Sequence, residues 1–340
     1  MRPFVYEKPA SVSAAVKSAS RFAADGLPPT QASAQFIAGG TNLADYMKLG
    51  VARPERLLDL NGLSEPVLRR IRVDADGIRF GALVRMSDAA GNSEIRHHYP
   101  VIADSLKLAA SGQLRNMASL AGNILQRTRC EYFRETSWPC NKRERGSGCA
   151  AMDGINRQHA VLGTSNACIA TYHGDFAQAL IALDAVVEVQ GPDGARKIPF
   201  AKLHRLPKDT PDVETSLASD EVITAIEVPA GAWTRRSLYL KIRDRESYAF
   251  ALASAAVALD MDGSKVSEAR IALGGVATVP WRAKAAEEAL RGKTLDEKSA
   301  QAAAEAAFQD ARPREHNAFK IDLGKRTLVR ALIETRDMKV

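Results

Sequence analysis

All four cysteines of this 340-residue chain lie within one short stretch, residues 130–168. Three stand inside CEYFRETSWPCNKRERGSGC and the fourth follows, so the spacing is C-x9-C-x8-C-x18-C. Structural thiols are usually scattered through buried strands and helices. Here they share a stretch that contains Pro, Gly and Ser and lacks regular hydrophobic periodicity. A common metal centre is the simplest reason for such a grouping.

Three kinds of site could use these thiols. Disulfides require an oxidising compartment, and four cysteines allow three pairings. A structural zinc site usually shows closely spaced C-x2-C pairs, which this stretch lacks. A 4Fe-4S cluster tolerates wide, irregular spacing because its ligands only have to reach four iron corners. We therefore rank the 4Fe-4S cluster first, zinc second and disulfides third. The candidate ligands are Cys130, Cys140, Cys149 and Cys168.

The residues around the cysteines are basic. Residues 126–158 carry seven Lys or Arg against four Asp or Glu. A four-iron cluster with four thiolates is a dianion when oxidised, so this excess would offset its buried charge. A solvated surface would explain the same excess. His159 and His173 flank the last cysteine, and with four thiols available we expect them to hydrogen-bond near the cluster rather than to ligate it.

A second candidate site is FIAGGTNL, residues 36–43, termed here the glycine loop. Two adjacent glycines follow an apolar strand, and glycine lets backbone N–H groups approach an anion closely. Thr41 and Asn42 could add side-chain donors. The pattern is neither G-x-G-x-x-G nor a Walker loop. By itself a Gly-Gly pair more often marks only a turn.

Helices and strands alternate around these two sites. Residues 11–26 have helical spacing with Gly26 as a C-cap, and Pro100 breaks a mostly helical stretch over 87–111. GPDG and MDGSK predict two hairpins. We predict a strand, a turn and a helix in 34–50, strands at 56–60, 77–83, 186–200, 221–229, 237–244 and within 251–273, and helices at 175–185 and from 281 onward.

Composition excludes several classes of protein. The formal net charge is +7, but the basic residues are dispersed and rarely interleave with aromatic ones, so we expect no nucleic-acid partner. The most apolar stretch, residues 248–259, is too short to span a bilayer. The start, MRPFVYEKPASVSAAV, lacks the apolar core of a signal peptide, so we expect no export signal of its own.

Four further motifs follow the glycine loop along the chain, and their order and spacing are informative. They are RNMASLAGNI (115–124), HGDFAQALIALDAVVEV (173–189), EVITAIEVP (221–229) and LKIR (240–243). In this order and spacing the chain resembles the FAD-binding subunit of the molybdenum hydroxylases, the family of xanthine dehydrogenase and carbon monoxide dehydrogenase. The resemblance covers nearly the whole chain. It departs from the family at HGDF, where Ser-Asp-Leu is usual.

This resemblance implies an α+β fold. A two-subdomain FAD-binding domain of the vanillyl-alcohol-oxidase (PCMH) type would occupy residues 1–229, divided at about 1–55 and 56–229. A C-terminal domain of antiparallel strands with helices would occupy 230–340. The cysteine segment, residues 126–168, would be a cluster-binding insert in the first domain.

The resemblance also assigns residues to FAD. The glycine loop matches the pyrophosphate loop, and a Ser with a Gly-Asn pair matches a second flavin-binding turn. Asp175 matches an Asp on the FAD ribose, Ile223 an apolar residue that lines the cofactor, and Lys241 a lysine that approaches it. Taken singly, Asp175 could be only a helix cap, Ile223 only a core residue and Lys241 only a surface charge. The full set is Phe36, Ile37, Ala38, Gly39, Gly40, Thr41, Asn42, Leu43, Ser119, Gly122, Asn123, Asp175, Ile223 and Lys241.

Within the family, the cysteine segment is most similar to that of the flavin subunit of periplasmic aldehyde oxidoreductases; hydroxybenzoyl-CoA reductase has a comparable cluster with different spacing. The resemblance implies an electron-transfer subunit with FAD and a 4Fe-4S cluster. Its partners would be a large molybdenum-cofactor subunit and a small subunit with two 2Fe-2S clusters, and electrons would leave through FAD to an external acceptor. We expect no acid–base catalytic residue in this chain.

The predicted cellular location and the predicted function each have alternatives. The resemblance implies a periplasmic location, reached by co-export with a signal-bearing partner subunit, whereas the chain alone is typical of a cytoplasmic protein. The alternatives in function are a flavin subunit of another molybdenum hydroxylase, a self-sufficient flavoenzyme of the same fold, and a nucleic-acid-binding protein with a four-thiolate zinc site.

Overall fold

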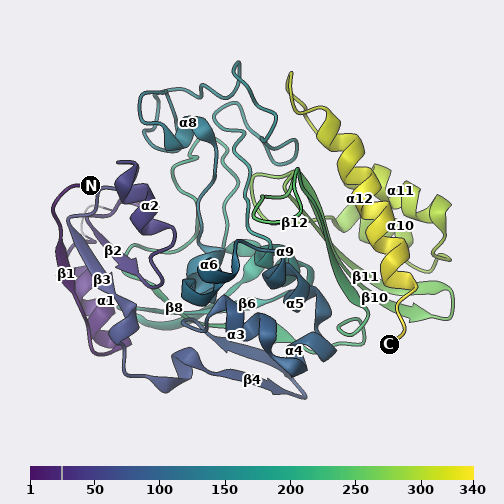
Figure 1. The fold of residues 1–340 in the computed structure, drawn as a ribbon, viewed down its shortest axis with the longest axis horizontal. Coiled ribbons are helices and arrows are strands. Elements are labelled where there is room, and N and C mark those ends of the chain that lie inside the picture. The colour runs from purple at the N-terminus through teal and green to yellow at the C-terminus, as the bar shows by residue number, and fades with distance from the viewer. Residues whose placement is uncertain (24–25) are drawn as a thin grey trace.

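Three sheets, each with its own helices, make up the computed structural model of this protein (Figure 1). The structure describes residues 1–23 and 26–340. Helices and antiparallel strands dominate, which confirms the predicted α+β class. Among the described residues, no helix has both the length and the apolar character needed to cross a bilayer.

The first unit is a small parallel sheet in the order β1-β3-β2. Strand β3 extends it to Asp59, slightly beyond the predicted subdomain limit at about residue 55. Helix α1 ends at Ser20, so the helix predicted over 11–26 is too long; Ala24 and Asp25 of that prediction lie outside the described residues. The elements of this unit are β1 (Val5–Glu7), α1 (Val12–Ser20), β2 (Ala34–Ile37), α2 (Leu43–Lys48) and β3 (Arg56–Asp59).

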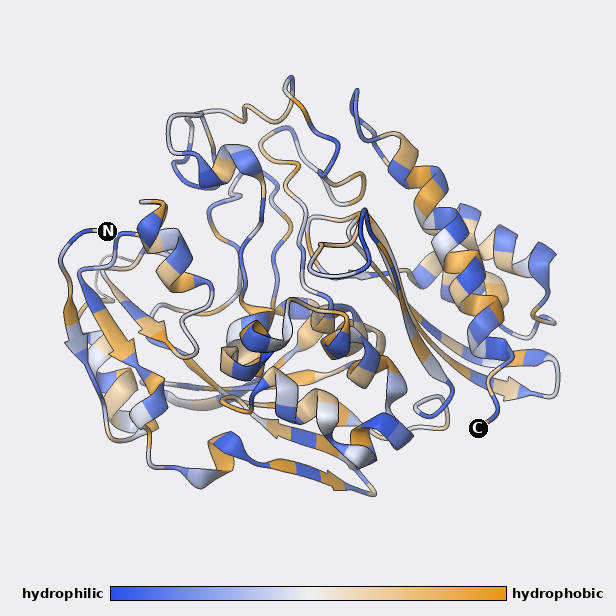
Figure 2. Cartoon of the chain, in the orientation of Figure 1, coloured by the Kyte–Doolittle hydropathy of each residue, from blue (hydrophilic) through white to orange (hydrophobic). Residues whose placement is uncertain are grey.

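The second unit is a five-stranded antiparallel sheet in the order β4-β5-β8-β6-β7. Hydrophobic and hydrophilic residues alternate along its strands (Figure 2), as expected where one face is buried. Phe80 of β5 packs edge-to-face on Phe176 of α9. The helical stretch is interrupted at Pro100 as predicted: α4 ends at His98, and Pro100 starts α5, a position where its missing N–H costs nothing. The elements are β4 (Ile71–Asp74), β5 (Gly77–Gly81), α3 (Met86–Gly91), α4 (Ser93–His98), α5 (Pro100–Lys107), α6 (Gly112–Met117), α7 (Leu120–Ile124), α9 (Phe176–Ala182), β6 (Val186–Gly191), β7 (Gly194–Pro199) and β8 (Val222–Pro229).

The third unit is an antiparallel sheet in the order β12-β11-β10-β9, covered by the last three helices. Strand β10 is buried on both faces: Ala256 and Ala258 join the core of the second unit, whereas Ala255 and Val257 join the core under the helices. Small residues on β10 therefore allow two cores to pack against one strand. The elements are β9 (Ser237–Ile242), β10 (Ala253–Asp262), β11 (Lys265–Gly274), β12 (Trp281–Arg282), α10 (Lys284–Leu290), α11 (Glu297–Ala307) and α12 (Phe319–Arg336).

The cysteine segment lies outside all three sheets, at the top of Figure 1. It contains one short helix, α8 (Glu131–Arg134), and the rest is turn and loop, in agreement with its lack of periodicity. Both predicted hairpins are confirmed, as β6–β7 and β10–β11. The predicted domain division near residue 230 falls in the connection between β8 and β9.

Candidate functional site

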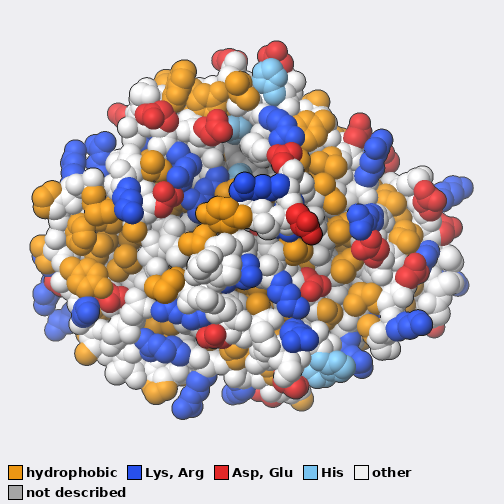
Figure 3. Space-filling model, in the orientation of Figure 1, with side chains coloured by type: hydrophobic (Ala, Val, Ile, Leu, Met, Phe, Trp, Pro, Cys, Tyr) orange, Lys and Arg blue, Asp and Glu red, His pale blue; other side chains and the backbone are white. Residues whose placement is uncertain are grey.

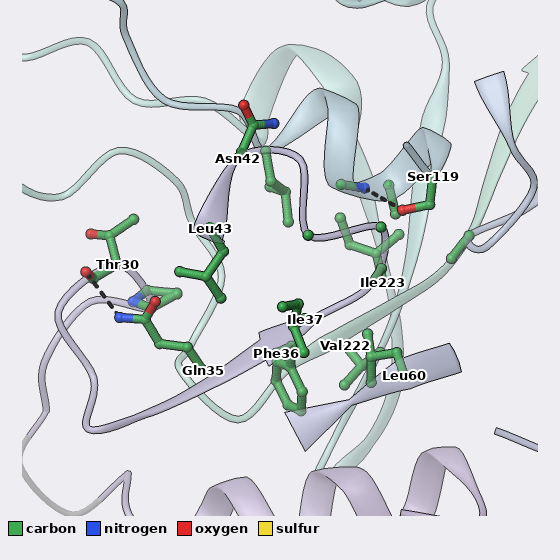
Figure 4. Close-up of a pocket in the computed structure, with 18 of the residues that line it drawn as sticks. Thr30, Gln35, Phe36, Ile37, Asn42, Leu43, Leu60, Ser119, Val222 and Ile223 are labelled. Carbon is green, nitrogen blue, oxygen red and sulfur yellow. Dashed lines mark hydrogen bonds between the residues drawn. The ribbon is translucent and has the colours of Figure 1, made fainter. Parts of the chain in front are cut away.

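A cleft lies where the first and second units meet, and is termed here the glycine-loop cleft (Figure 4). Its free space, open mouth included, is about 1230 Å³. Phe36, Leu60 and Val222 give it apolar walls. Segments far apart in the sequence thus converge on one cavity. The predicted cofactor residues that line it are Phe36, Ile37, Ala38, Gly39, Gly40, Thr41, Asn42, Leu43, Ser119, Gly122 and Ile223.

The two glycines of the loop are required for different reasons. A Cβ on Gly39 would lie 2.1 Å from the carbonyl oxygen of Met117, so here backbone touches backbone. Gly40 has φ of +71°, which side-chain-bearing residues rarely adopt. Successive N–H groups around such a residue form a concavity that binds anions. Asn61 supports the loop from behind, because its Nδ2 donates to the carbonyl oxygen of Ala38 at 2.7 Å.

The second predicted flavin-binding turn is instead a short helix, α7. Ser119 is its N-cap, and its Oγ accepts a hydrogen bond from the Gly122 N–H at 3.2 Å (Figure 4). Asn123 does not line the cleft. Its Oδ1 is buried and has no hydrogen-bond partner among the described residues.

Together these residues fit a dinucleotide such as FAD. The apolar walls suit flat ring systems, and the glycine loop suits an anionic pyrophosphate.

Several cleft residues were not predicted from the sequence. Tyr46 lines the cleft three residues after Leu43, on the same side of α2, so helical spacing could have found it. Arg127 and Leu217 also line it, but they come from irregular segments in which spacing gives no signal.

Asp175 and Lys241 contact each other and do not line the glycine-loop cleft. Lys241 Nζ lies 2.8 Å from Asp175 Oδ2, and the Tyr239 hydroxyl donates to Oδ1 at 2.7 Å. Both charged side chains are almost fully buried. Burial raises the pKa of Asp175, although Lys241 opposes the rise. Asp175 precedes α9 without capping it, so its carboxylate instead joins the second unit to β9 of the third.

The four cysteines share one hydrophobic cluster, behind the glycine-loop cleft. All four are free thiols; Cys130, Cys140 and Cys168 are buried and Cys149 is half-buried. The backbones of Cys140 and Cys149 pair as an isolated bridge. Leu43, Tyr46 and Ile37 of the cleft wall belong to the same cluster. The cysteines therefore pack against the wall that the glycine loop forms.

Burial opposes ionisation of three of these thiols, Cys130, Cys149 and Cys168. Burial raises the pKa of Cys130 to about 12 and that of Cys168 to about 11. His159 Nε2 lies 3.1 Å from Cys130 Sγ, and burial lowers the pKa of this histidine to about 4. His173 is half-buried, packs edge-to-face on Phe250 and hydrogen-bonds to the carbonyl oxygen of Thr171. In the part of the chain that the structure describes, no three Cys, His, Asp or Glu side chains converge closely enough for a single metal ion.

The basic residues of the cysteine segment are mostly paired, and two of them, Arg145 and Arg157, are also exposed to solvent. Most of them form ion pairs with acidic residues outside the segment, and Arg143 donates to backbone carbonyls within it. The visible face shows Lys and Arg dispersed among Asp and Glu (Figure 3). Lys142 also lies near enough to Cys168 to oppose the rise in its pKa, so the offset of a buried cluster charge by this excess stays a prediction. The pairs are Arg127–Glu214, Lys142–Glu214, Arg129–Asp45, Arg134–Asp45, Arg145–Asp212 and Arg157–Asp244.

Comparison with known families agrees with this geometry. Residues 2–231 match the family described as "FAD binding domain in molybdopterin dehydrogenase", and residues 238–335 match the "CO dehydrogenase flavoprotein C-terminal domain". The chain therefore belongs to the family of FAD-binding subunits of the molybdenum hydroxylases, which are oxidoreductases, as the resemblance implied.

Individual relatives extend this result over the whole chain. The chain is 47% identical over 338 residues to the aldehyde oxidoreductase FAD-binding subunit PaoB of Escherichia coli K12, covering 99% of each. It is 28% identical to the carbon monoxide dehydrogenase medium chain of Hydrogenophaga pseudoflava, over 92% of this chain and 88% of that one. A solved structure of carbon monoxide dehydrogenase from that organism superposes with a TM-score of 0.74 at 28% identity, covering 98% and 96% of the two chains.

Proposed function

We propose that this chain is the FAD- and 4Fe-4S-containing electron-transfer subunit of a molybdenum-dependent aldehyde oxidoreductase. It would work beside a large subunit with the molybdenum cofactor and a small subunit with two 2Fe-2S clusters. The 47% identity to an aldehyde oxidoreductase FAD-binding subunit supports the aldehyde assignment. When bound, FAD would take up electrons singly and release them in pairs to an external acceptor.

The observation that carries this proposal is the convergence of the glycine loop with Ser119, Gly122 and Ile223 in one cleft. The residues of this chain would hold the cofactor rather than perform acid–base chemistry. The glycine loop would hold the pyrophosphate through its N–H groups, and the apolar walls would exclude water from the rings.

The environment of the four cysteines is an argument for the proposed 4Fe-4S cluster. They are free and share one hydrophobic cluster, and burial raises the pKa of three of the thiols, Cys130, Cys149 and Cys168, so thiolates there would need a compensating cation. Four thiolates are the ligand set of a 4Fe-4S cluster. That cluster is larger than a single ion, so its ligands need not converge as closely as those of zinc.

A visible spectrum with metal analysis tests both cofactors on the full-length chain. We expect flavin absorption in the blue, a broad brown shoulder, and about four iron atoms with about four acid-labile sulfides per chain. Zinc without flavin would show that the proposal is wrong. Flavin without iron would support the proposed flavin subunit but contradict the proposed 4Fe-4S cluster.

The proposed location is the periplasm, reached by co-export with a signal-bearing partner subunit. Fractionation of cells that express all three subunits tests it: deletion of the partner's signal should leave this chain in the cytoplasm. A chain that is exported when expressed alone would contradict co-export.

A further inference from the structure

Helix α2 stands between the two proposed cofactor sites. The glycine loop leads directly into it, and Tyr46 and Met47 on α2 pack in the same hydrophobic cluster as Cys130 and Phe133. Tyr46 meets Phe133 edge-to-face, with ring centroids 6.1 Å apart. A displacement of the cysteine segment would therefore reach α2 and the loop before it.

One arginine joins the two sites directly. Arg129 precedes Cys130, and its guanidinium donates to Asn42 Oδ1 at 2.6 Å and to Asp45 Oδ2 at 3.1 Å. Asn42 is the N-cap of α2 and lines the glycine-loop cleft, but its side chain does not cap the helix. The Arg129 guanidinium also lies 5.7 Å from the centre of the Tyr46 ring, which lines the cleft as well.

The hydrogen bond from Arg129 determines which atoms of the Asn42 side chain remain free to bind a ligand. A side-chain amide has an acceptor end and a donor end, and arginine can only donate. Arg129 therefore engages the oxygen of Asn42 and leaves its NH₂ group for another acceptor. Phosphate oxygens are such acceptors, and the cleft is the site where the glycine loop would meet them.

We propose that Arg129 is a positioning residue through which the cysteine segment controls FAD binding: it fixes Asn42 as a donor to the FAD pyrophosphate and holds α2 in place. This inference rests on the proposed function. Because coupling between sites is reciprocal, bound FAD also stabilises the segment around Cys130.

The test compares Arg129→Gln with Arg157→Gln in the full-length chain. Arg157 belongs to the same segment and pairs with Asp244, but it contacts neither α2 nor the cleft. After removal of FAD, titration with fresh FAD should give a dissociation constant about tenfold higher for Arg129→Gln and unchanged for Arg157→Gln, because only the first change removes the charged donor that orients Asn42 and holds Asp45 of α2. Arg129→Lys should recover only part of the affinity, since an ammonium lacks the planar fork.

Hydrogen exchange supplies a readout that a purely structural role would not change. Adding FAD should slow exchange of the Phe133 and Arg134 amides, which bond to the Cys130 carbonyl, in the wild type and in Arg157→Gln but not in Arg129→Gln. Wild-type affinity in Arg129→Gln, or an equal loss in Arg157→Gln, overturns the inference.

A second variant keeps the test decisive if Arg129→Gln does not fold. Asn42→Asp retains an oxygen for Arg129 but replaces the NH₂ donor by negative charge, so FAD affinity should fall at least about tenfold at unchanged iron content. Unchanged affinity in Asn42→Asp also overturns the inference. Failure of the wild-type chain to bind any FAD would instead contradict the proposed function.

Discussion

The glycine-loop cleft and the cysteine segment are neighbours that are stabilised in different ways. In the cleft, backbone packs on backbone, as where Gly39 meets the Met117 carbonyl. The cysteine segment has one helix of four residues and is fastened by ion pairs to Asp45, Glu214 and Asp244. Close packing responds little to salt or pH, whereas ion pairs and thiolates respond to both. Mutations in the two regions should therefore differ in how their effects depend on salt and pH, and each should reduce mainly the cofactor of its own region.

Removal of one thiol should have the largest effect. Cys140 is buried and its backbone pairs with that of Cys149. Serine does not supply a thiolate, so Cys140→Ser should reduce iron from about four to below about one per chain. FAD should remain bound, though more weakly, because the cleft keeps its own packing. Iron and flavin analysis of one sample measures both. Full iron content in Cys140→Ser would contradict the ligand assignment.

The next largest effect should come from the carboxylate that binds two cations of the cysteine segment. Glu214 contacts Arg127 at 2.6 Å and Lys142 at 3.4 Å, and the three side chains are 15%, 9% and 12% exposed. Burial opposes ionisation of Glu214, but the two cations outweigh it and hold its pKa below the usual value. Glu214→Gln would leave both cations nearly buried and unpaired, so we expect a loss of about 3 kcal/mol in the free energy of unfolding.

Chemical denaturation measures this loss. Because folding lowers the pKa of Glu214, its contribution is present above the pKa of the unfolded chain and disappears as the pH falls through the folded value. Glu214→Gln should therefore differ from the wild type at neutral pH and converge with it in acid. A difference that persists in acid would assign the loss to packing instead.

Substitution of Gly39 by alanine tests whether the close approach of two backbones shapes the cleft. Gly39→Ala places a Cβ against the Met117 carbonyl, where two backbones would have to separate, so we expect a loss of about 2 kcal/mol in unfolding free energy and of most FAD binding. Iron content should stay close to that of the wild type. Gly91→Ala is the control, because a Cβ there meets nothing within 4 Å. Equal effects of the two substitutions would show that the close approach does not matter.

A buried lysine on the C-terminal side of the cysteine segment should give a smaller, pH-dependent effect. Lys320 of α12 donates to the carbonyl oxygens of Gln158 at 3.1 Å and Gly275 at 2.7 Å. Burial lowers its pKa to about 7; Arg157 lowers it further and Asp244 opposes this. In the unfolded chain the lysine stays charged to about pH 10. Between these two pKa values the folded chain therefore binds fewer protons than the unfolded chain. The free energy of unfolding should rise with pH there, by at most about 1.4 kcal/mol per pH unit.

Denaturation from about pH 6.5 to about pH 8.5 measures the rise. Lys320→Met should abolish it. The control is Lys325→Met on the same helix, where Nζ contacts Glu305 at 2.6 Å near the surface, and the rise should persist. A rise that survives in Lys320→Met would assign it to another group.

The sequence predicted regular elements and backbone motifs better than it predicted side-chain partners. The glycine loop was recognisable because Gly39 and Gly40 are backbone requirements that only glycine meets. By contrast, the Gly122-Asn123 turn proved to be a helix, since Ser119 caps it through a local hydrogen bond. Arg127 joins a cleft to a distant Glu214 across irregular chain. Such contacts depend on how units pack, which neither periodicity nor composition encodes.

The smallest effect should come from the exposed pair that fastens the other side of the cysteine segment. Arg157 and Asp244 are 2.8 Å apart, but their side chains are 46% and 49% exposed, so solvent screens their attraction. We expect Asp244→Asn to change the free energy of unfolding by less than about 0.5 kcal/mol and to leave iron and FAD unchanged. Denaturation at low and high salt measures this. A loss as large as that of Glu214→Gln would mean that the segment is held equally from both sides; a small one means that its attachment depends mainly on the buried pairs beside the glycine-loop cleft.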